Sequence, residues 1–251
     1  MTSMMSNTLI YRKEAWYDLL SVWRTPGFVI PSLAFPTIFY LFFGVIFNSG
    51  AASAYMLVTY GCFGIMGPAM FNFAINIASD RAHGWLTLKR LSPMPAAAYL
   101  LAKFTTSLVF SLVIIVALFS IAALFADVRL HSSQWLLLAL VLLLGTAPFA
   151  LIGLILGLTL SDKAAPGVVN LIYLPMALLS GLWLPIHIMP TLLQQASWIW
   201  PSYHLSQLGL KIITMDQGHA LWAHLLFLLV SSLLLAVTAA WSFKRMTGAK
   251  V

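Results

Sequence analysis

Charged side chains are scarce in this sequence. Only 8% of the 251 residues are Asp, Glu, Lys or Arg, whereas 61% are apolar. A soluble globular domain is about 25% charged and about 45–50% apolar, so a soluble enzyme is excluded. A disordered chain is excluded as well, because disorder needs low hydrophobicity. The composition indicates an integral membrane protein, and the 13% of aromatic residues suits aromatic belts at the membrane interfaces.

Cysteine and catalytic motifs are also sparse. The single cysteine, Cys62, excludes an intrachain disulfide framework. His219 and His224 lack the intervening carboxylate of an HExxH zinc site, and the sequence has no GxxxxGK[ST] phosphate loop. We therefore expect a chain that is not an enzyme and binds no cofactor or metal. If ATP is used, another subunit must hydrolyse it.

Uncharged runs divide the chain into expected spans. A helix needs roughly 20 apolar residues to cross about 30 Å of hydrocarbon, so the length of each run limits its spans. The run of 55 residues between Arg24 and Asp80 has room for two spans. The whole sequence predicts spans at 28–47, 55–78, 104–126, 135–160, 165–184 and 221–243.

The run of 47 residues between Lys163 and Lys211 is long enough for two spans. Its prolines argue against a second regular helix, because proline lacks an amide donor, and its Gln, Ser and His residues are too polar to face lipid. We expect instead a re-entrant or interfacial element, since non-helical backbone at membrane depth needs a cover of protein or water. The expected fold is all-α, with an N-terminal amphipathic interfacial helix (1–27), a six-helix transmembrane domain (28–251), an outer re-entrant element (186–211) and a cytoplasmic tail (244–251).

Lysine and arginine favour one side of the membrane. With six spans and an internal amino terminus, eleven of the thirteen fall inside, and only Arg129 and Lys211 fall outside. Cytoplasmic loops carry such an excess, so we expect a multi-pass protein of the plasma (inner) membrane with both termini in the cytoplasm. The net charge of +7 then indicates loops facing anionic lipid and no nucleic-acid partner.

The segment ahead of the first span is amphipathic. Its tryptophans and leucines share one arc of a helix, and most of its charges lie elsewhere. This pattern suits a helix in the cytoplasmic interface. Two readings remain open: a membrane anchor alone, or an anchor that also forms a shelf for a cytoplasmic partner. The shelf would use Arg12, Glu14, Trp16, Trp23, Arg24 and Pro26.

A short basic loop (79–98) joins the second and third expected spans. It has room for one or two helical turns before Pro93. Leu88 and Leu91 would share a face, with Trp85 beside it, while Lys89 points away. The residues alone favour a loop whose positive charge fixes the topology. The alternative is a small knob that another protein grips.

Ionisable side chains are missing from the interior of the expected spans, apart from edge residues such as Lys103. Ion-coupled carriers usually keep such groups inside the membrane, so their absence counts against that class. Asn72 and Asn76 lie four residues apart on the second span. They serve either as packing contacts between helices or as part of a substrate path.

Three motifs, taken in order, resemble the type-2 permease family of ABC exporter membrane subunits, and together they cover nearly the whole chain. Tyr11-Arg12-Lys13-Glu14 followed by Trp23-Arg24-Thr25-Pro26 is similar to the family's amphipathic entry helix. Asp80-Arg81 with Gly84, Leu88 and Ser92-Pro93 resembles its cytoplasmic loop. Ser180-Gly181 ahead of Pro185, Pro190 and Pro201 resembles its outer signature. Ala82 and His83 depart from the pattern, because the family often has further charge there.

The resemblance implies a half-transporter that dimerises with an identical or different permease chain and docks two cytoplasmic ABC ATPase subunits, which bind ATP and Mg. The loop after the second span would act as a coupling helix through Asp80, Arg81, Gly84, Trp85, Leu88, Lys89, Arg90, Leu91, Ser92 and Pro93. The outer element would line or gate the exit. The expected path or gate residues are Asn72, Asn76, Ser180, Gly181, Pro185, Pro190, Pro201, Tyr203 and His204.

The expected function is ATP-driven export of a hydrophobic or amphipathic substrate, such as a drug or antibiotic, a lipid or a peptide, by alternating access. An ion-coupled secondary carrier or a passive channel remains the alternative. A membrane enzyme or a structural scaffold is a third class, and the missing catalytic clusters count against the enzyme.

Overall fold

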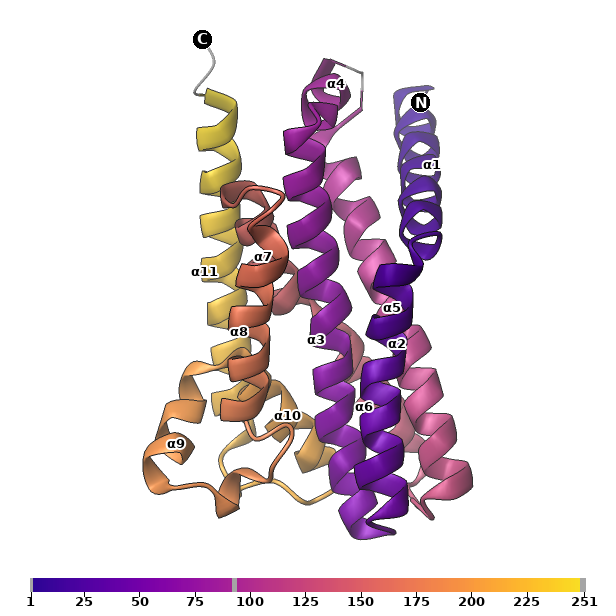
Figure 1. The fold of residues 1–251 in the computed structure, drawn as a ribbon, viewed down its shortest axis with the longest axis vertical. Helices are drawn as coiled ribbons and strands as arrows, with labels where there is room; N and C mark the ends of the chain where they lie inside the picture. Colours follow the sequence, from indigo (N-terminus) through magenta and orange to yellow (C-terminus); the bar gives the residue numbers. More distant parts are fainter. Residues whose placement is uncertain (1, 92–93, 249–251) are drawn as a thin grey trace.

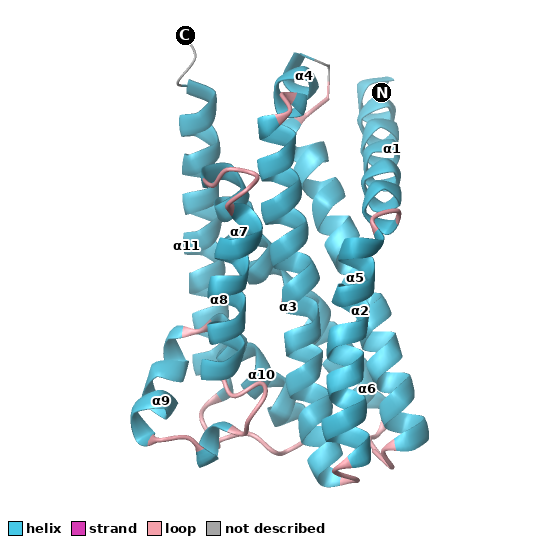
Figure 2. Cartoon of the chain, viewed as in Figure 1, coloured by secondary structure: helices cyan, strands magenta, loops and turns pink. Residues whose placement is uncertain are grey.

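The computed structural model describes residues 2–91 and 94–248, and all regular structure within them is helical (Figure 2). The elements in order are α1 (Thr2–Trp23), α2 (Pro26–Phe39), the π-helix η1 (Tyr40–Ile46), α3 (Ala51–Ala82), α4 (Trp85–Leu91), α5 (Ala96–Phe125), α6 (Ser132–Leu144), α7 (Thr146–Thr159), α8 (Ala165–Leu179), the 3-10 turn η2 (Ile186–Ile188), α9 (Thr191–Ala196), the 3-10 turn η3 (Ser197–Ile199), α10 (Pro201–Ile212) and α11 (Leu221–Gly248).

These helices form one elongated bundle (Figure 1). The beginning of α1, the short helix α4 and the last turns of α11 lie at one end of the bundle, which we call the α4 end. The helices α9 and α10 lie at the opposite end, which we call the α9 end. This arrangement puts the beginning of α1, the loop after α3 and the end of α11 on the same side.

Among the described residues, five helical segments are long and apolar enough to cross a membrane. They are Pro26–Ile46, Ala51–Ala82, Ala97–Phe125, Ser132–Thr159 and Leu221–Arg245. The apolar helix α8 has 15 residues, fewer than the roughly 20 that a regular span needs. The chain is therefore a multi-pass membrane protein, and the predicted all-α fold class is confirmed.

Helix α3 forms the centre of the bundle. In its most apolar window 78% of the residues are buried, compared with 11% in α11. Helix α7 packs directly on α3 because Gly153 and Gly157 have no side chain between the two backbones. A Cβ atom at Gly153 would lie 2.5 Å from the Met70 carbonyl oxygen, and one at Gly157 would lie 2.8 Å from that of Phe73. This close approach is typical of small residues spaced four apart in membrane helices.

Two spans are less regular than the sequence suggested. The expected fourth span is two helices, α6 and α7, which meet at Gly145. Pro148, in the first turn of α7, lacks the amide N–H that would donate a helical hydrogen bond to the Leu144 carbonyl. The expected fifth span is shorter than 165–184, because α8 ends at Leu179. Gly181, at φ +74°, takes the left-handed conformation that commonly ends a helix.

The expected re-entrant region consists of η2, α9, η3 and α10. Pro185 and Pro190 directly precede η2 and α9, and Pro201 is the first residue of α10. Proline suits a helix start, because the amide N–H that it lacks would have no hydrogen-bond acceptor within the helix there. The chain leaves α8 and enters α11 near the α9 end (Figure 1), so these pieces return to the side where they began.

Candidate functional site

The turn after α3 presents a short helix with an apolar outer face. Gly84 lies at φ +75°, a conformation that glycine adopts without strain, and α4 follows it at once. Leu86 faces inward and is 7% exposed. Trp85, Leu88 and Leu91 face outward, with exposures of 55%, 58% and 81%. The structure therefore agrees with the predicted apolar face of this loop.

Two basic side chains hold this turn against its neighbours, one at the end of α3 and one in α4. Arg81 Nη1 donates to the Gly157 and Leu160 carbonyls at 2.9 and 3.2 Å. These carbonyls belong to the end of α7, where helical acceptors have no partner of their own. Lys89 Nζ pairs with Glu14 of α1. The loop and the N-terminal helix, which the sequence indicated as two separate partner sites, are therefore in contact.

A cluster of five charged side chains lies beneath α4. We call Glu14, Asp18, Asp80, Lys89 and Lys103 the charge cluster. The Lys103 side chain is 3% exposed, and its Nζ lies 3.0 Å from Asp18 Oδ1 and 3.6 Å from Asp80 Oδ2. Since a buried charge is costly unless it is paired, Lys103 depends on both carboxylates. The cluster connects α1, α3, α4 and α5.

Two polar side chains of α5 complete this arrangement. The Tyr99 hydroxyl donates to Asp80 Oδ2 at 2.6 Å, and the Thr106 hydroxyl donates to Asp18 Oδ2 at 2.7 Å. Lys89 Nζ and Lys103 Nζ lie 4.5 and 4.9 Å from the centre of the Tyr99 ring, within cation–π range. Each carboxylate that faces Lys103 thus has a second partner.

Helix α1 turns its acidic side chains toward the protein and its two tryptophans outward. Trp16 and Trp23 are 61% and 49% exposed, whereas Glu14 and Asp18 belong to the charge cluster. Arg12 and Arg24 are also exposed. Pro26 is the first residue of α2. This orientation suits aromatic contact with a membrane interface, and the partner-shelf role of these residues remains a prediction.

A cavity of about 570 Å³ opens between α2, α3 and α8. Its wall is mainly apolar and contains several aromatic residues and prolines, with a few polar side chains. The lining includes Phe28, Phe35, Phe71, Asn76, Asn170 and Tyr173. Asn170 is exposed on an otherwise apolar helix, which is costly against lipid unless water or protein covers it.

The two asparagines of α3 have different surroundings. Asn72 is 2% exposed and donates to the Lys103 carbonyl and to Ser107 Oγ, both at 3.1 Å. It therefore joins α3 to α5, as the packing interpretation expects. Asn76 donates to Asn72 Oδ1 at 2.6 Å and also borders the cavity. Of the two, only Asn76 lines the cavity, and its role in a substrate path remains a prediction.

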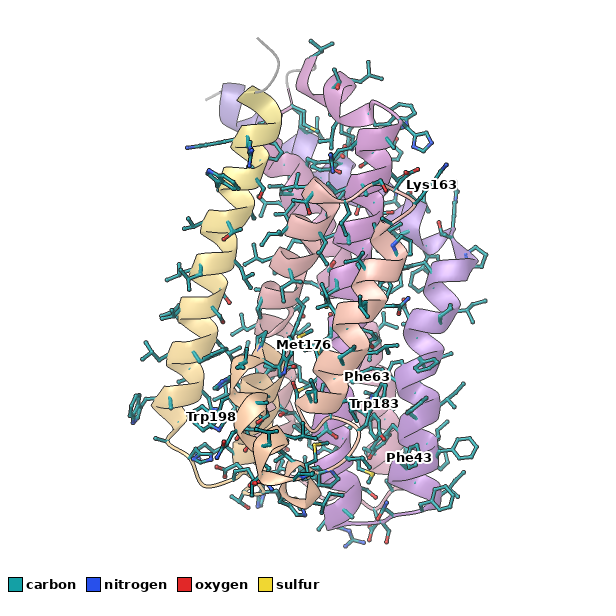
Figure 3. The ribbon with its side chains drawn as sticks, turned by 60° about the vertical axis from the view of Figure 1, so that its left-hand side comes forward. Phe43, Phe63, Lys163, Met176, Trp183 and Trp198 are labelled. Atoms are coloured by element: carbon teal, nitrogen blue, oxygen red, sulfur yellow. The ribbon has the colours of Figure 1, made fainter. Side chains whose placement is uncertain are left out.

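The predicted outer-gate residues lie together at the α9 end. The Ser180 and Ser202 hydroxyls are 2.5 Å apart and buried, which ties the end of α8 to α10. His204 Nε2 donates to the Trp198 carbonyl at 2.9 Å, and its Nδ1 lies 2.9 Å from Nδ1 of His224 in α11. Tyr203 is buried beside them. Figure 3 shows Trp198 near the beginning of α11, and Trp183 and Phe63 close together in the same half of the bundle.

The loop after α10 is closed by an ion pair. Lys211 Nζ donates to Asp216 Oδ2 at 2.6 Å and to the His219 carbonyl at 2.7 Å. Burial alone would raise the pKa of Asp216, but the hydrogen bonds from Lys211 and from the Gly218 amide outweigh it and hold that pKa below its ordinary value. The carboxylate is therefore the favoured form.

Sequence reasoning missed four side chains in and around the charge cluster, one of which is Thr106. Asp18, Tyr99 and Lys103 were not among the predicted coupling or shelf residues. One signal was present, because Asp18 follows Glu14 by four residues and such residues share a helix face. Ser92 and Pro93, which were predicted as coupling residues, lie outside the described residues. Arg90 lies in α4.

Known proteins similar to this chain are named as transport permeases. Residues 14–214 match the family model described as "ABC-2 type transporter". A Bacillus subtilis (strain 168) protein named "Putative transport permease YvfS" is 29% identical over 230 residues, covering 90% of this chain and 93% of that protein. A Pyropia yezoensis protein named "Putative transport permease ycf38" is 26% identical over 210 residues, covering 77% and 70%. The chain belongs to the ABC-2 type transporter family of membrane permease subunits, which lack a nucleotide-binding domain of their own.

Proposed function

We propose that the chain is the membrane half of an ATP-driven exporter and that α4 is its docking helix for a cytoplasmic ABC ATPase subunit. The observation that carries this proposal is the outer face of α4. Trp85, Leu88 and Leu91 are more than half exposed at an end of the bundle where basic residues gather. An apolar patch that faces water typically marks a site of protein association.

The fixed position of α4 supports this role. A helix of seven residues is not stable by itself, so its orientation depends on Leu86, on the Lys89–Glu14 pair and on the end of α3, which Arg81 joins to α7. Through these contacts, a force applied to α4 reaches α7 and α1. The chain would then lie in the inner membrane with the α4 end facing the cytoplasm, where α1 begins and α11 ends.

The cavity between α2, α3 and α8 supports a path for an apolar or amphipathic cargo. Its aromatic wall offers dispersion contacts, and Asn76 and Asn170 offer a few hydrogen-bonding groups, a combination typical of small-molecule sites. A second permease chain facing this surface would cover Asn170 and enclose the cavity. The outer element, with Ser180, Tyr203 and His204, would close the far end of the path.

The test uses the variant Leu88→Asp in the complex with its ATPase subunit, reconstituted in lipid nanodiscs. An unpaired neutral polar group in an apolar groove costs roughly 1–3 kcal/mol and a carboxylate costs more, so binding should weaken by at least about 5-fold. Leu88 is 58% exposed, so the variant should insert and fold normally. We expect loss of ATPase binding and of substrate-stimulated ATP hydrolysis.

The matched control is Ser161→Asp. Ser161 is exposed in the turn between α7 and α8, and its hydroxyl accepts from the Ala164 amide at 3.3 Å, a contact that aspartate can also make. The control adds the same charge elsewhere on the permease and should bind the ATPase as the wild type does. Wild-type binding and stimulation in Leu88→Asp would refute the assignment of α4. Transport without any ATPase would favour the carrier or channel.

A further inference from the structure

Charges are concentrated where α1, α3, α4 and α5 meet, in a chain whose spans are otherwise apolar. Three carboxylates and two ammonium groups make up the charge cluster, within which Lys103 contacts Asp18 and Asp80 while Lys89 contacts Glu14. The Lys103 side chain is 3% exposed, and that of Asp18 is 10% exposed. Buried ion pairs contribute little to stability compared with apolar packing. We therefore look to a role in positioning the helices, and not to stability, to explain the charge cluster.

The cluster lies between the docking helix and the cavity. Glu14 and Asp18 are four residues apart on α1 and bind Lys89 of α4 and Lys103 of α5. Helix α1 passes into α2 through a turn in which the Thr25 hydroxyl donates to the Ser21 carbonyl at 3.0 Å. Helix α2 then supplies Phe28 and Phe35 to the cavity wall. A continuous set of contacts thus joins α4 to one wall of the cavity.

We propose that Lys103 is a positioning residue that makes α1 and α4 move as one unit, so that displacement of α4 by the ATPase is transmitted through α1 to α2. This inference rests on the proposed docking role of α4. Lys103 touches neither the expected ATPase surface nor the cavity, since Leu88 and Leu91 point outward and Lys103 is absent from the cavity lining. Its function is to hold the Asp18 and Asp80 carboxylates, and with them α1 and the end of α3, in one arrangement.

The experiment compares Lys103→Met with the wild type in the permease–ATPase complex in nanodiscs. Methionine keeps an unbranched side chain but leaves Asp18 and Asp80 without their shared cation. We expect ATPase binding to stay within about twofold of the wild type, because the outer face of α4 is intact. We expect the substrate stimulation of ATP hydrolysis to fall by about tenfold, a typical size for coupling between sites.

Conservative and milder variants separate positioning from folding. Lys103→Arg keeps the charge and should restore most of the stimulation. Tyr99→Phe removes the hydrogen bond to Asp80 while leaving every charge in place, and it should lower the stimulation without affecting assembly. The matched control is Lys163→Met, since Lys163 is exposed in the turn between α7 and α8; it should behave as the wild type.

A direct reading of the movement uses spin labels at Trp16 in α1 and His83 in the turn before α4, both of which are exposed. In the wild-type complex the distance between the labels should keep one narrow distribution with and without ATP. In Lys103→Met it should broaden when ATP is added, because the two helices then move separately.

Three results would overturn the inference. Unchanged stimulation in Lys103→Met would show that the cluster transmits nothing. Parallel loss of ATPase binding and thermal stability in both Lys103→Met and Tyr99→Phe would show a role in folding alone. A wild-type permease that binds no ATPase would refute the proposed function itself, and this result is distinct from the other two because it appears without any substitution.

Discussion

Replacing Gly157 by alanine tests the contact on which the bundle depends most closely. The added Cβ atom would lie 2.8 Å from the Phe73 carbonyl oxygen, 2.9 Å from Ile77 Cβ and 3.0 Å from the Ala74 carbonyl oxygen. Two of these neighbours are backbone atoms of the buried helix α3, which cannot move aside as a flexible side chain can. Helix α7 must therefore move away from α3.

The cost follows from overpacking. Inserting a methyl group into a close-packed core typically costs about 1–3 kcal/mol, and 1 kcal/mol shifts the melting temperature of a protein of this size by roughly 2–4 °C. We expect Gly157→Ala to melt roughly 2–12 °C below the wild type. The Gly157 carbonyl also accepts from Arg81, so the displacement should loosen the turn that carries α4 and reduce ATPase stimulation.

The assay is the melting temperature of the purified permease in detergent, measured by tryptophan fluorescence. Gly167→Ala is the matched control, because nothing lies within 4 Å of a Cβ atom at this position of α8. The control should melt at the wild-type temperature or slightly above it, since alanine favours helix over glycine by about 1 kcal/mol. Equal melting temperatures for Gly157→Ala and Gly167→Ala would refute the close contact between α3 and α7.

Two further predictions concern the α9 end. Asp216→Asn should destabilise the protein by roughly 1–2 kcal/mol at neutral pH, whereas Asp127→Asn, in an exposed ion pair with Arg129, should not. The folded pKa of Asp216 is lowered, so the carboxylate stabilises the folded protein fully above the unfolded pKa of about 4, and this stabilisation is lost as the pH falls below that value. A difference in the free energy of unfolding between the wild type and Asp216→Asn that grows in acid would contradict this. Cysteines that replace Gln194 or Lys211, on a Cys62→Ala background, should react with an impermeant thiol reagent added outside the cell. Labelling of the cysteine at position 211 only from the cytoplasm would overturn the six-span arrangement.

Much of the fold follows from composition and spacing. Uncharged runs locate the long helices because hydrocarbon excludes unpaired charge, and the prolines between positions 185 and 201 mark where the short helices begin. The subdivision of the fourth span was not predicted, although Gly145 and Pro148 were visible in the sequence. A single proline near the middle of an apolar run is compatible with either a kink or a break, and the packing of Leu205 against Gly145 becomes known only in three dimensions.

The site was less predictable than the fold. The outward direction of Leu88 and Leu91 follows from helical spacing, which is a local property. The pairing of Lys103 with Asp18 joins residues 85 positions apart, and no periodicity within one helix contains that information. The same holds for Arg81 and the end of α7. Such contacts depend on how the helices are arranged around α3, and a single sequence does not reveal that arrangement.

The most direct measurement of the docking role is photocrosslinking from α4 within the assembled complex. A photoactivatable amino acid is placed at Leu88 or Leu91 on α4, and at Leu192 or Ile199 at the α9 end, where those side chains are 74% and 69% exposed. We predict that the ATPase subunit, identified by its mass and by nucleotide binding, is captured from positions 88 and 91 and not from positions 192 and 199. Capture from the α9 end, or no capture from α4 in an actively hydrolysing complex, would contradict the proposed function.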